Sequence, residues 1–196
     1  MFIDVLRLAT YSAAMPLPRG FVPPCLPTNA PQPPSGDAWL HEIKHDGFRV
    51  IARKDGERVR LYSRPGNDLT YRFPLIVEAL TRLRSRSCII DGEAVACDGD
   101  GRPSFDRIRY RKHDGDVFLY AFDLIELNGD DLRRDPLDVR KATLKSVLAK
   151  AAPGLRTSRL TAPRCSHTPA RWGSKASCRG ARIPPTALAA RPTGSK

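Results

Sequence analysis

The chain has 196 residues, with 33 Lys and Arg against 21 Asp and Glu and a formal net charge of +12 at pH 7. This length suits one domain with a single core, and the sequence has no run of 18 apolar residues that would span a membrane. The charge points to a nucleic-acid partner, but residues 155–196 hold nine of the basic residues and no acidic one, which leaves 24 basic and 21 acidic residues in 1–154. Most of the excess charge therefore belongs to the C-terminal segment.

Composition divides the chain into three parts. Residues 16–36 contain eight prolines, which predicts an extended, polyproline-like segment. We therefore predict a proline-rich lead-in at residues 1–36, a folded domain at 37–154 and a basic disordered tail at 155–196. The five cysteines are odd in number and form no C-x-x-C pair, which is typical of a protein of the reducing cytoplasm.

Three strands are predicted at the start of the folded domain. Residues 39–43 alternate as in a strand, and Asp46-Gly47 is typical of the tight turn of a hairpin. Residues 48–53 would then return antiparallel to the first strand. Residues 57–63 alternate again after a second turn, and a turn-rich loop follows at 63–68.

Two helices and two further strands are predicted downstream. Pro74 opens a helix, and residues 136–150 form an amphipathic helix that Pro153-Gly154 ends. Residues 87–97 and 116–127 are largely apolar strands, the second of them central in its sheet. The side chains predicted to face the core are Leu75, Ile76, Val77, Leu80 and Leu83 in the first helix, and Leu137, Val139, Leu144, Val147 and Leu148 in the second.

Lys44 ends the first predicted strand and is the candidate nucleophile. A lysine can attack an electrophile if its surroundings lower its pKa, and burial beside a cation such as Arg49 would favour the neutral amine. His41-Glu42-Ile43-Lys44-His45 also spells the H-E-x-x-H pattern of zinc proteases. That pattern requires a helix, which Asp46-Gly47 would break directly after the second histidine, so we favour the strand.

Four segments in order resemble motifs of the covalent nucleotidyltransferases, the superfamily of ATP-dependent DNA ligases, RNA ligases and mRNA capping enzymes. Residues 44–49 (K-H-D-G-F-R) resemble motif I, residues 63–66 (S-R-P-G) the arginine loop, residues 91–93 (D-G-E) motif III and residues 122–123 (F-D) motif IIIa. The resemblance covers about residues 15–154, where the sequence is similar to the ligase domain of bacterial end-joining ligases. It implies an α+β, ATP-grasp-like adenylation domain with antiparallel sheets, packed helices and a nucleotide site between the sheets.

The resemblance also implies a reaction and its partners. Lys44 would attack the α-phosphate of ATP, expel pyrophosphate and form lysyl-AMP; the AMP would pass to a DNA 5′-phosphate, from which the 3′-hydroxyl displaces it. Nicked or broken duplex DNA and end-joining proteins would be the partners. The implied nucleotide contacts are Glu42 with the adenine amine, Arg49 and Arg64 with ribose or phosphate oxygens, Glu93 with the ribose hydroxyl or Mg²⁺, and Phe122 stacked on adenine.

The match stops after Gly154. Two later ligase motifs, E-G-[IL]-V and K-x-K, are missing from the remaining sequence. Codons for residues 172–178, read one base earlier, are compatible with Met-Gly-Leu-Glu-Gly-Ile-Val, so we expect a frameshift near residue 155 and a domain that is incomplete at its C-terminus. Activity of this chain should then be impaired or absent. The alternatives are a non-catalytic nucleic-acid-binding remnant and an RNA ligase or capping-type nucleotidyltransferase.

Overall fold

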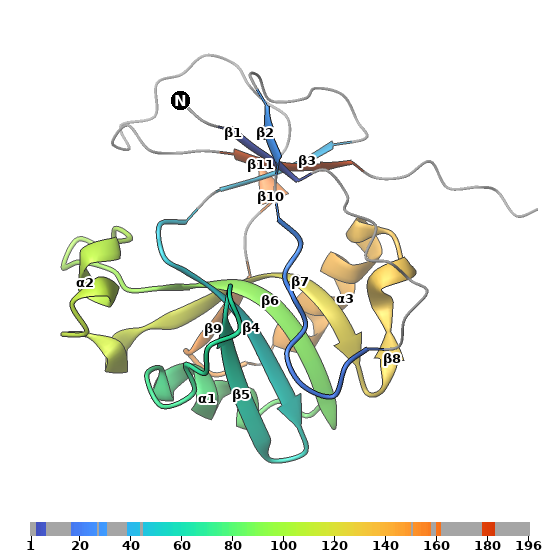
Figure 1. Cartoon of the computed structure of the whole chain (residues 1–196), viewed down its shortest axis with the longest axis horizontal. Coiled ribbons are helices and arrows are strands. Elements are labelled where there is room, and N and C mark those ends of the chain that lie inside the picture. Colours follow the sequence, from blue (N-terminus) through green and yellow to red (C-terminus); the bar gives the residue numbers. More distant parts are fainter. Residues whose placement is uncertain are drawn as a thin grey trace, which may run out of the picture.

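The computed structural model describes residues 3–6, 17–26, 28–30, 39–43, 45–149, 151–157, 160–161 and 178–182. These residues form two β-sheets with α-helices packed on the larger one, which confirms the predicted α+β class (Figure 1). The larger sheet has six strands in the order β5-β4-β6-β7-β8, with β9 beside β7. The smaller sheet has the order β10-β3-β11-β1-β2 and lies at the top of Figure 1.

The six-stranded sheet consists of β4 (Phe48–Asp55), β5 (Arg58–Ser63), β6 (Ser87–Val95), β7 (Phe118–Leu127), β8 (Asp130–Asp131) and β9 (Leu155–Thr157). The five-stranded sheet consists of β1 (Ile3–Leu6), β2 (Thr28–Ala30), β3 (Trp39–Ile43), β10 (Leu160–Thr161) and β11 (Cys178–Arg182). The helices are α1 (Pro74–Thr81), α2 (Phe105–Arg109) and α3 (Leu137–Leu148), with short 3₁₀ turns at Asp114–Asp116 and Leu132–Arg134. Strand pairs are antiparallel except β7 with β9 and β1 with β11.

The two faces of the six-stranded sheet carry different clusters, because neighbouring residues of a strand point to opposite faces. Val50 and Ile90 belong to the main core, which also contains buried residues of α1 and α3. Ile51 and Ile89 belong to a smaller cluster with Val22 of the lead-in. Residues 17–26 therefore lie over the second face, and the guanidinium of Arg53 donates to the carbonyl oxygens of Pro18 and Gly20 at 2.8 and 3.0 Å.

The predicted first hairpin is wrong. Strand β3 pairs with β10 and β11, whereas β4 pairs with β5 and β6, so the two strands lie in different sheets. Asp46-Gly47 is the connection between the sheets rather than a hairpin turn. Gly47 is needed for close approach to β6, because a Cβ there would overlap the carbonyl oxygen of Ala94 and lie 3.0 Å from Cγ of Glu93.

Helix α1 begins at Pro74 and α3 directly after Pro136, as predicted, whereas α2 was not predicted. The inward face of α3 differs from the expected one. Leu137, Leu144 and Leu148 are buried, as predicted. Val139 is 47% exposed, whereas Arg140 is 5% exposed. The helix thus turns a charged side chain toward the sheet in place of an apolar one.

Residues beyond the predicted end of the domain also form strands. Strand β9 runs parallel to β7, and β10 and β11 both pair with β3. The division of the chain at residues 36 and 154 stays a prediction. Within the described residues, Cys88 and Cys97 are free thiols, and no helix is long and apolar enough to cross a membrane.

Candidate functional site

An irregular pairing of β6 with β7 brings the acidic residues of the candidate site together. Asp91 is opposite Asp123, and Glu93 is opposite Tyr120, but the register shifts between Asp91 and Gly92, so that Phe122 is an extra residue on β7. Such a bulge reorients the side chains that follow it. Asp91, Glu93, Tyr120 and Asp123 consequently share the face of the sheet that lies opposite the main core.

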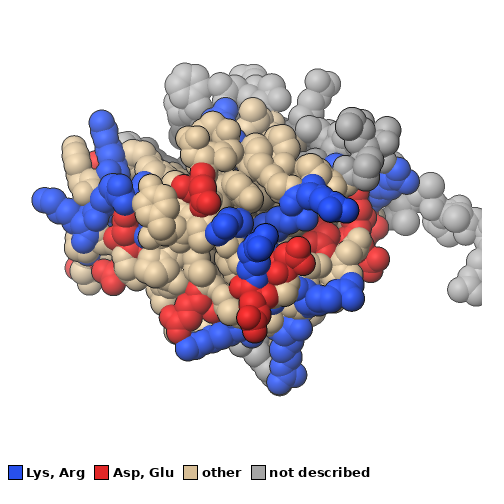
Figure 2. Space-filling view, turned by 60° about the horizontal axis from the view of Figure 1, so that its bottom comes forward, with Lys and Arg blue, Asp and Glu red and all other residues tan. Residues whose placement is uncertain are grey.

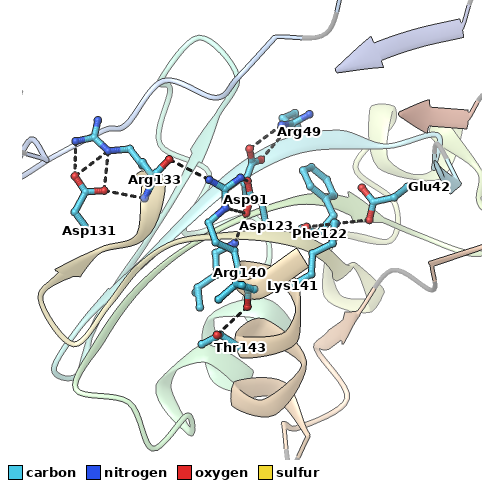
Figure 3. Close-up of polar contacts among 12 residues, drawn as sticks. Glu42, Arg49, Asp91, Phe122, Asp123, Asp131, Arg133, Arg140, Lys141 and Thr143 are labelled. Atoms are coloured by element: carbon cyan, nitrogen blue, oxygen red, sulfur yellow. Dashed lines mark hydrogen bonds and ion pairs between the residues drawn. The ribbon is translucent and has the colours of Figure 1, made fainter. Parts of the chain in front are cut away.

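Arg49 of β4 lies opposite Glu93 in the strand register, and its side chain forms an ion pair with Asp91 on this face (Figure 3). Nε of Arg49 lies 2.5 Å from Oδ1 of Asp91, and Nη2 lies 2.7 Å from Oδ2. The Asp91 side chain is 2% exposed, and a carboxylate this deeply buried needs such a partner. The guanidinium also lies over the ring of Phe122, 4.4 Å from its centroid. The carboxylate of Asp91 therefore offsets the positive charge of Arg49.

Motif I contributes a second contact to this face. The ring of His45 stacks on that of Tyr120 with centroids 3.8 Å apart and planes 2° from parallel. Tyr120 is directly opposite Glu93, which is 7% exposed. The connection between the two sheets is thus packed against the strand pair that carries the carboxylates.

Helix α3 reaches the same residues through Arg140 and Lys141, as Figure 3 shows. Arg140 places Nη2 3.0 Å from Oδ2 of Asp123 and Nε 3.0 Å from Oδ1. The Lys141 ammonium donates to Oε1 of Glu42 at 2.6 Å and to the carbonyl oxygen of Phe122 at 2.5 Å. Glu42 is 5% exposed. Two consecutive cations of one helix therefore hold consecutive residues of β7.

The carboxyl of Asp123 has a raised proton affinity. Burial raises the pKa of its carboxyl to about 6, and the neighbouring Asp91 carboxylate adds to the rise, whereas Arg140 and Lys141 oppose it. The folded protein therefore holds the Asp123 proton at pH values where the unfolded chain has released it.

We expect this pKa to appear in the pH dependence of stability. Between about pH 4 and about pH 6 the folded state binds the extra proton, so the contribution of Asp123 to the free energy of unfolding falls as the pH rises. Urea unfolding of wild type and Asp123→Asn across this range measures the effect. As the pH rises, the free energy of unfolding of the wild type should fall relative to that of Asp123→Asn.

Asp114→Asn is the matched control. The hydrogen bond from Arg72 lowers the pKa of Asp114, so the stabilisation by this carboxylate is complete above about pH 4 and is lost only below it. The difference between wild type and Asp114→Asn should be constant from about pH 4 to about pH 6. A constant difference for Asp123→Asn as well would contradict the raised pKa.

The structure brings most of the predicted site residues together. Glu42, Arg49, Glu93 and Phe122 surround one end of the β4-β6-β7 face. Arg64 is exposed in the turn after β5 and is not part of the buried group. Lys44 lies outside the described residues. The sequence did not predict the ion pairs that Asp91, Asp123, Arg140 and Lys141 form at this site.

The H-E-x-x-H interpretation does not fit this geometry. Residues 39–43 are strand β3, not a helix, and the Glu42 carboxylate is bound by Lys141. Within the described residues no three His, Cys, Asp or Glu side chains cluster as a metal site. A nucleotide-bound Mg²⁺ needs only one or two protein carboxylates besides phosphate and water oxygens, so the predicted role of Glu93 toward Mg²⁺ does not require such a cluster.

Known proteins resemble the chain over this same region. The model of the ATP dependent DNA ligase domain family matches residues 30–167. The multifunctional non-homologous end joining protein LigD of Pseudomonas aeruginosa is 38% identical over 136 residues, which are 68% of this chain and 16% of that protein. A DNA ligase of Natronomonas pharaonis is 42% identical over 119 residues, or 55% of this chain and 22% of that one.

Solved structures agree with these relatives. Mycobacterial DNA ligase D complexed with ATP and MES is 33% identical, with a TM-score of 0.54 over 62% of this chain and 40% of that chain. The ligase domain of LigD from M. tuberculosis is 32% identical, with a TM-score of 0.55 over 63% and 41%. The chain thus spans less than half of each of these proteins. The motif order, the geometry and the family match lead to one conclusion: the chain belongs to the ATP-dependent DNA ligase domain family.

Proposed function

We propose that this chain carries the nucleotide-binding and lysine-adenylation part of an ATP-dependent DNA ligase. Lys44 attacks the α-phosphate of ATP, the bond to pyrophosphate breaks, and a phosphoramidate bond forms between Nζ and AMP. The observation that carries the proposal is the convergence of Glu42, Arg49, Glu93 and Phe122 from four strands of two sheets. They come from motif I and its flank, from motif III and from motif IIIa.

The proposed roles follow from the chemistry of these side chains. Glu42 accepts a hydrogen bond from the adenine amine, and Phe122 offers an apolar ring for stacking. Arg49 and Arg64 hold ribose or phosphate oxygens, and Glu93 accepts from the ribose hydroxyl or holds Mg²⁺. Bound to the nucleotide, Mg²⁺ would neutralise phosphate charge. Lys44 must be neutral to attack. Arg49 favours the neutral amine less than expected, because Asp91 neutralises the charge of Arg49.

Duplex DNA as the second substrate is supported by a basic surface on α2 and the turn after it. Arg109, Arg111 and Lys112 are exposed, and Tyr110 is 63% exposed beside them. Figure 2 shows Lys and Arg at the left of the molecule, the side on which α2 lies in Figure 1, as well as across the centre and bottom of that face. Phe105 of α2 packs on Phe48 with centroids 5.4 Å apart, so this surface lies next to the motif I connection. Cations there can bind DNA phosphates near the adenylated lysine.

Labelling with radioactive nucleotide tests the proposal. After incubation with Mg²⁺ and either α-labelled ATP or α-labelled GTP, we expect label from ATP alone to stay on the protein through denaturing gel electrophoresis, because a phosphoramidate survives denaturation. The yield from this chain should be low, since the two later motifs are missing. Label from GTP would favour a capping-type enzyme instead. Salt-dependent DNA binding without any covalent label would favour a non-catalytic remnant.

The state of the C-terminal segment belongs to the same proposal. We propose that residues 155–196 arise from a frameshift that removed motifs E-G-[IL]-V and K-x-K. The DNA sequence around codon 155 tests this directly, because correcting a single inserted or deleted base should bring E-G-[IL]-V back into the reading frame. The cytoplasmic location and the association with end-joining proteins stay predictions.

A further inference from the structure

Lys141 connects the two sheets at the candidate nucleotide site. Its ammonium donates both to Glu42 of β3, in the five-stranded sheet, and to the carbonyl oxygen of Phe122 in β7, in the six-stranded sheet. Figure 3 shows the Lys141 side chain reaching from α3 toward these two acceptors. In the proposed function, Glu42 and Phe122 are the two residues that contact the adenine base. Lys141 itself would touch neither the base nor the reacting phosphate.

Lys141 and Glu42 are both largely buried, so the Glu42 carboxylate depends on Lys141 as its partner. The Lys141 side chain is 10% exposed and that of Glu42 is 6% exposed. A carboxylate removed from water in this way must be paired, or it takes up a proton or moves toward solvent. Arg140, the preceding residue, is bound to Asp123. The first turns of α3 are thus fixed to β7, which limits where the Lys141 ammonium can lie.

We infer that Lys141 is a positioning residue that sets the preference for adenine over 6-oxopurines. With Oε1 bound to Lys141, an ionised Glu42 keeps Oε2 as an acceptor. Adenine presents an amino group at position 6, which donates to a carboxylate. Guanine and hypoxanthine present a carbonyl oxygen there, which a carboxylate repels. Loss of the Lys141 cation would release the Glu42 carboxylate from this position, and the contact with the 6-amino group would be lost with it.

This inference rests on the proposed function, and its test compares ATP with ITP, which differs from ATP at position 6 of the base. Ligand-observed NMR titrations of the full chain with Mg²⁺ measure both affinities, including weak ones. The basic C-terminal segment would bind both nucleotides alike through their identical triphosphates, so the affinity ratio reports on the base. We expect wild type to prefer ATP by about tenfold or more, as one buried charge-assisted hydrogen bond implies.

Lys141→Met should lower ATP affinity by about tenfold, affect ITP much less and bring the ratio close to one. Lys141→Arg, which keeps the charge, should retain part of the preference. Lys145→Met is the matched control, because Lys145 is exposed one turn further along α3, and it should leave both affinities unchanged. A parallel loss of ATP and ITP in Lys141→Met, or an unchanged ratio, would show that Lys141 has only a structural role or none here.

A second comparison covers the case in which Lys141→Met fails to fold around an unpaired Glu42. Glu42→Gln removes the carboxylate, and its amide can also donate to a 6-oxo group, so its ratio should also approach one. Adding Lys141→Met to Glu42→Gln removes both charges and should not change the ratio further if Lys141 acts through Glu42. A further change in the double variant would overturn the inference. If wild type bound neither nucleotide, both the proposed function and this inference would be wrong. If wild type bound ATP but Lys141→Met left the ratio of ATP to ITP affinity unchanged, only this inference would be wrong.

Discussion

Replacing Lys44 with alanine abolishes covalent AMP labelling in a version of the protein whose two later motifs have been restored, whereas His41→Ala leaves most of it. This is the expected result because Lys44 is the lysine of the K-x-D-G-x-R motif, and its amine is the nucleophile to which the proposed function assigns the phosphoramidate bond. The measurement is retention of label from α-labelled ATP through a denaturing gel. Both variants are compared at equal protein concentration with the parent.

The His41 variant separates this chemistry from the overlapping zinc-protease pattern. Activity that disappears in His41→Ala together with a bound zinc ion would contradict the ligase assignment of this segment. A substitution of His45 would be a weaker control than His41→Ala, because the ring of His45 stacks on Tyr120, which lies opposite Glu93. Its loss should disturb the packing of the motif I connection without removing the nucleophile.

The second large effect concerns the chain as it stands, which we expect not to seal nicks. Sealing requires the lysyl-AMP, charge stabilisation at the α-phosphate and a grip on duplex DNA. Loss of one preorganised charge-stabilising group costs about a hundred- to a thousandfold in rate, and the motifs E-G-[IL]-V and K-x-K would supply several. The predicted outcome is no ligated product from a singly nicked duplex with ATP and Mg²⁺.

The assay needs sequence-verified protein and a Lys44→Ala control. A clear ligated product that is absent from the control would show that residues 155–196 supply what the missing motifs do in other ligases. The pairing of β10 and β11 with β3 identifies the segments through which they would do so. Deleting residues 178–182 from an active chain would then abolish sealing.

Local pattern was enough to predict most of the individual elements. Strands β5, β6 and β7 and the starts of α1 and α3 follow from alternation, apolar runs and the positions of Pro74 and Pro136, which act within a few residues. Local pattern did not predict how the strands pair. Asp46-Gly47 has the composition of a hairpin turn, yet β4 is paired on both sides by β5 and β6, which leaves no free edge for β3.

One missed contact had a signal in the sequence. Arg140 and Lys141 lie between Leu137 and Leu144 on the core-facing side of α3, and two charged residues at such positions require buried partners. The identity of those partners was not available from the sequence. Arg140 binds a carboxylate 17 residues away, and Lys141 binds one 99 residues away.

The sequence by itself therefore determined the motifs, their order and the residue types that the chemistry requires. Only the tertiary structure decided that Asp91 neutralises Arg49 and that Lys141 joins Glu42 to Phe122. The physical reason is that a motif is selected by side-chain chemistry at short spacing, which can be read along the chain. The charge balance of a buried site depends instead on groups that the sheet register and the packing of α3 bring within 3 Å from distant positions.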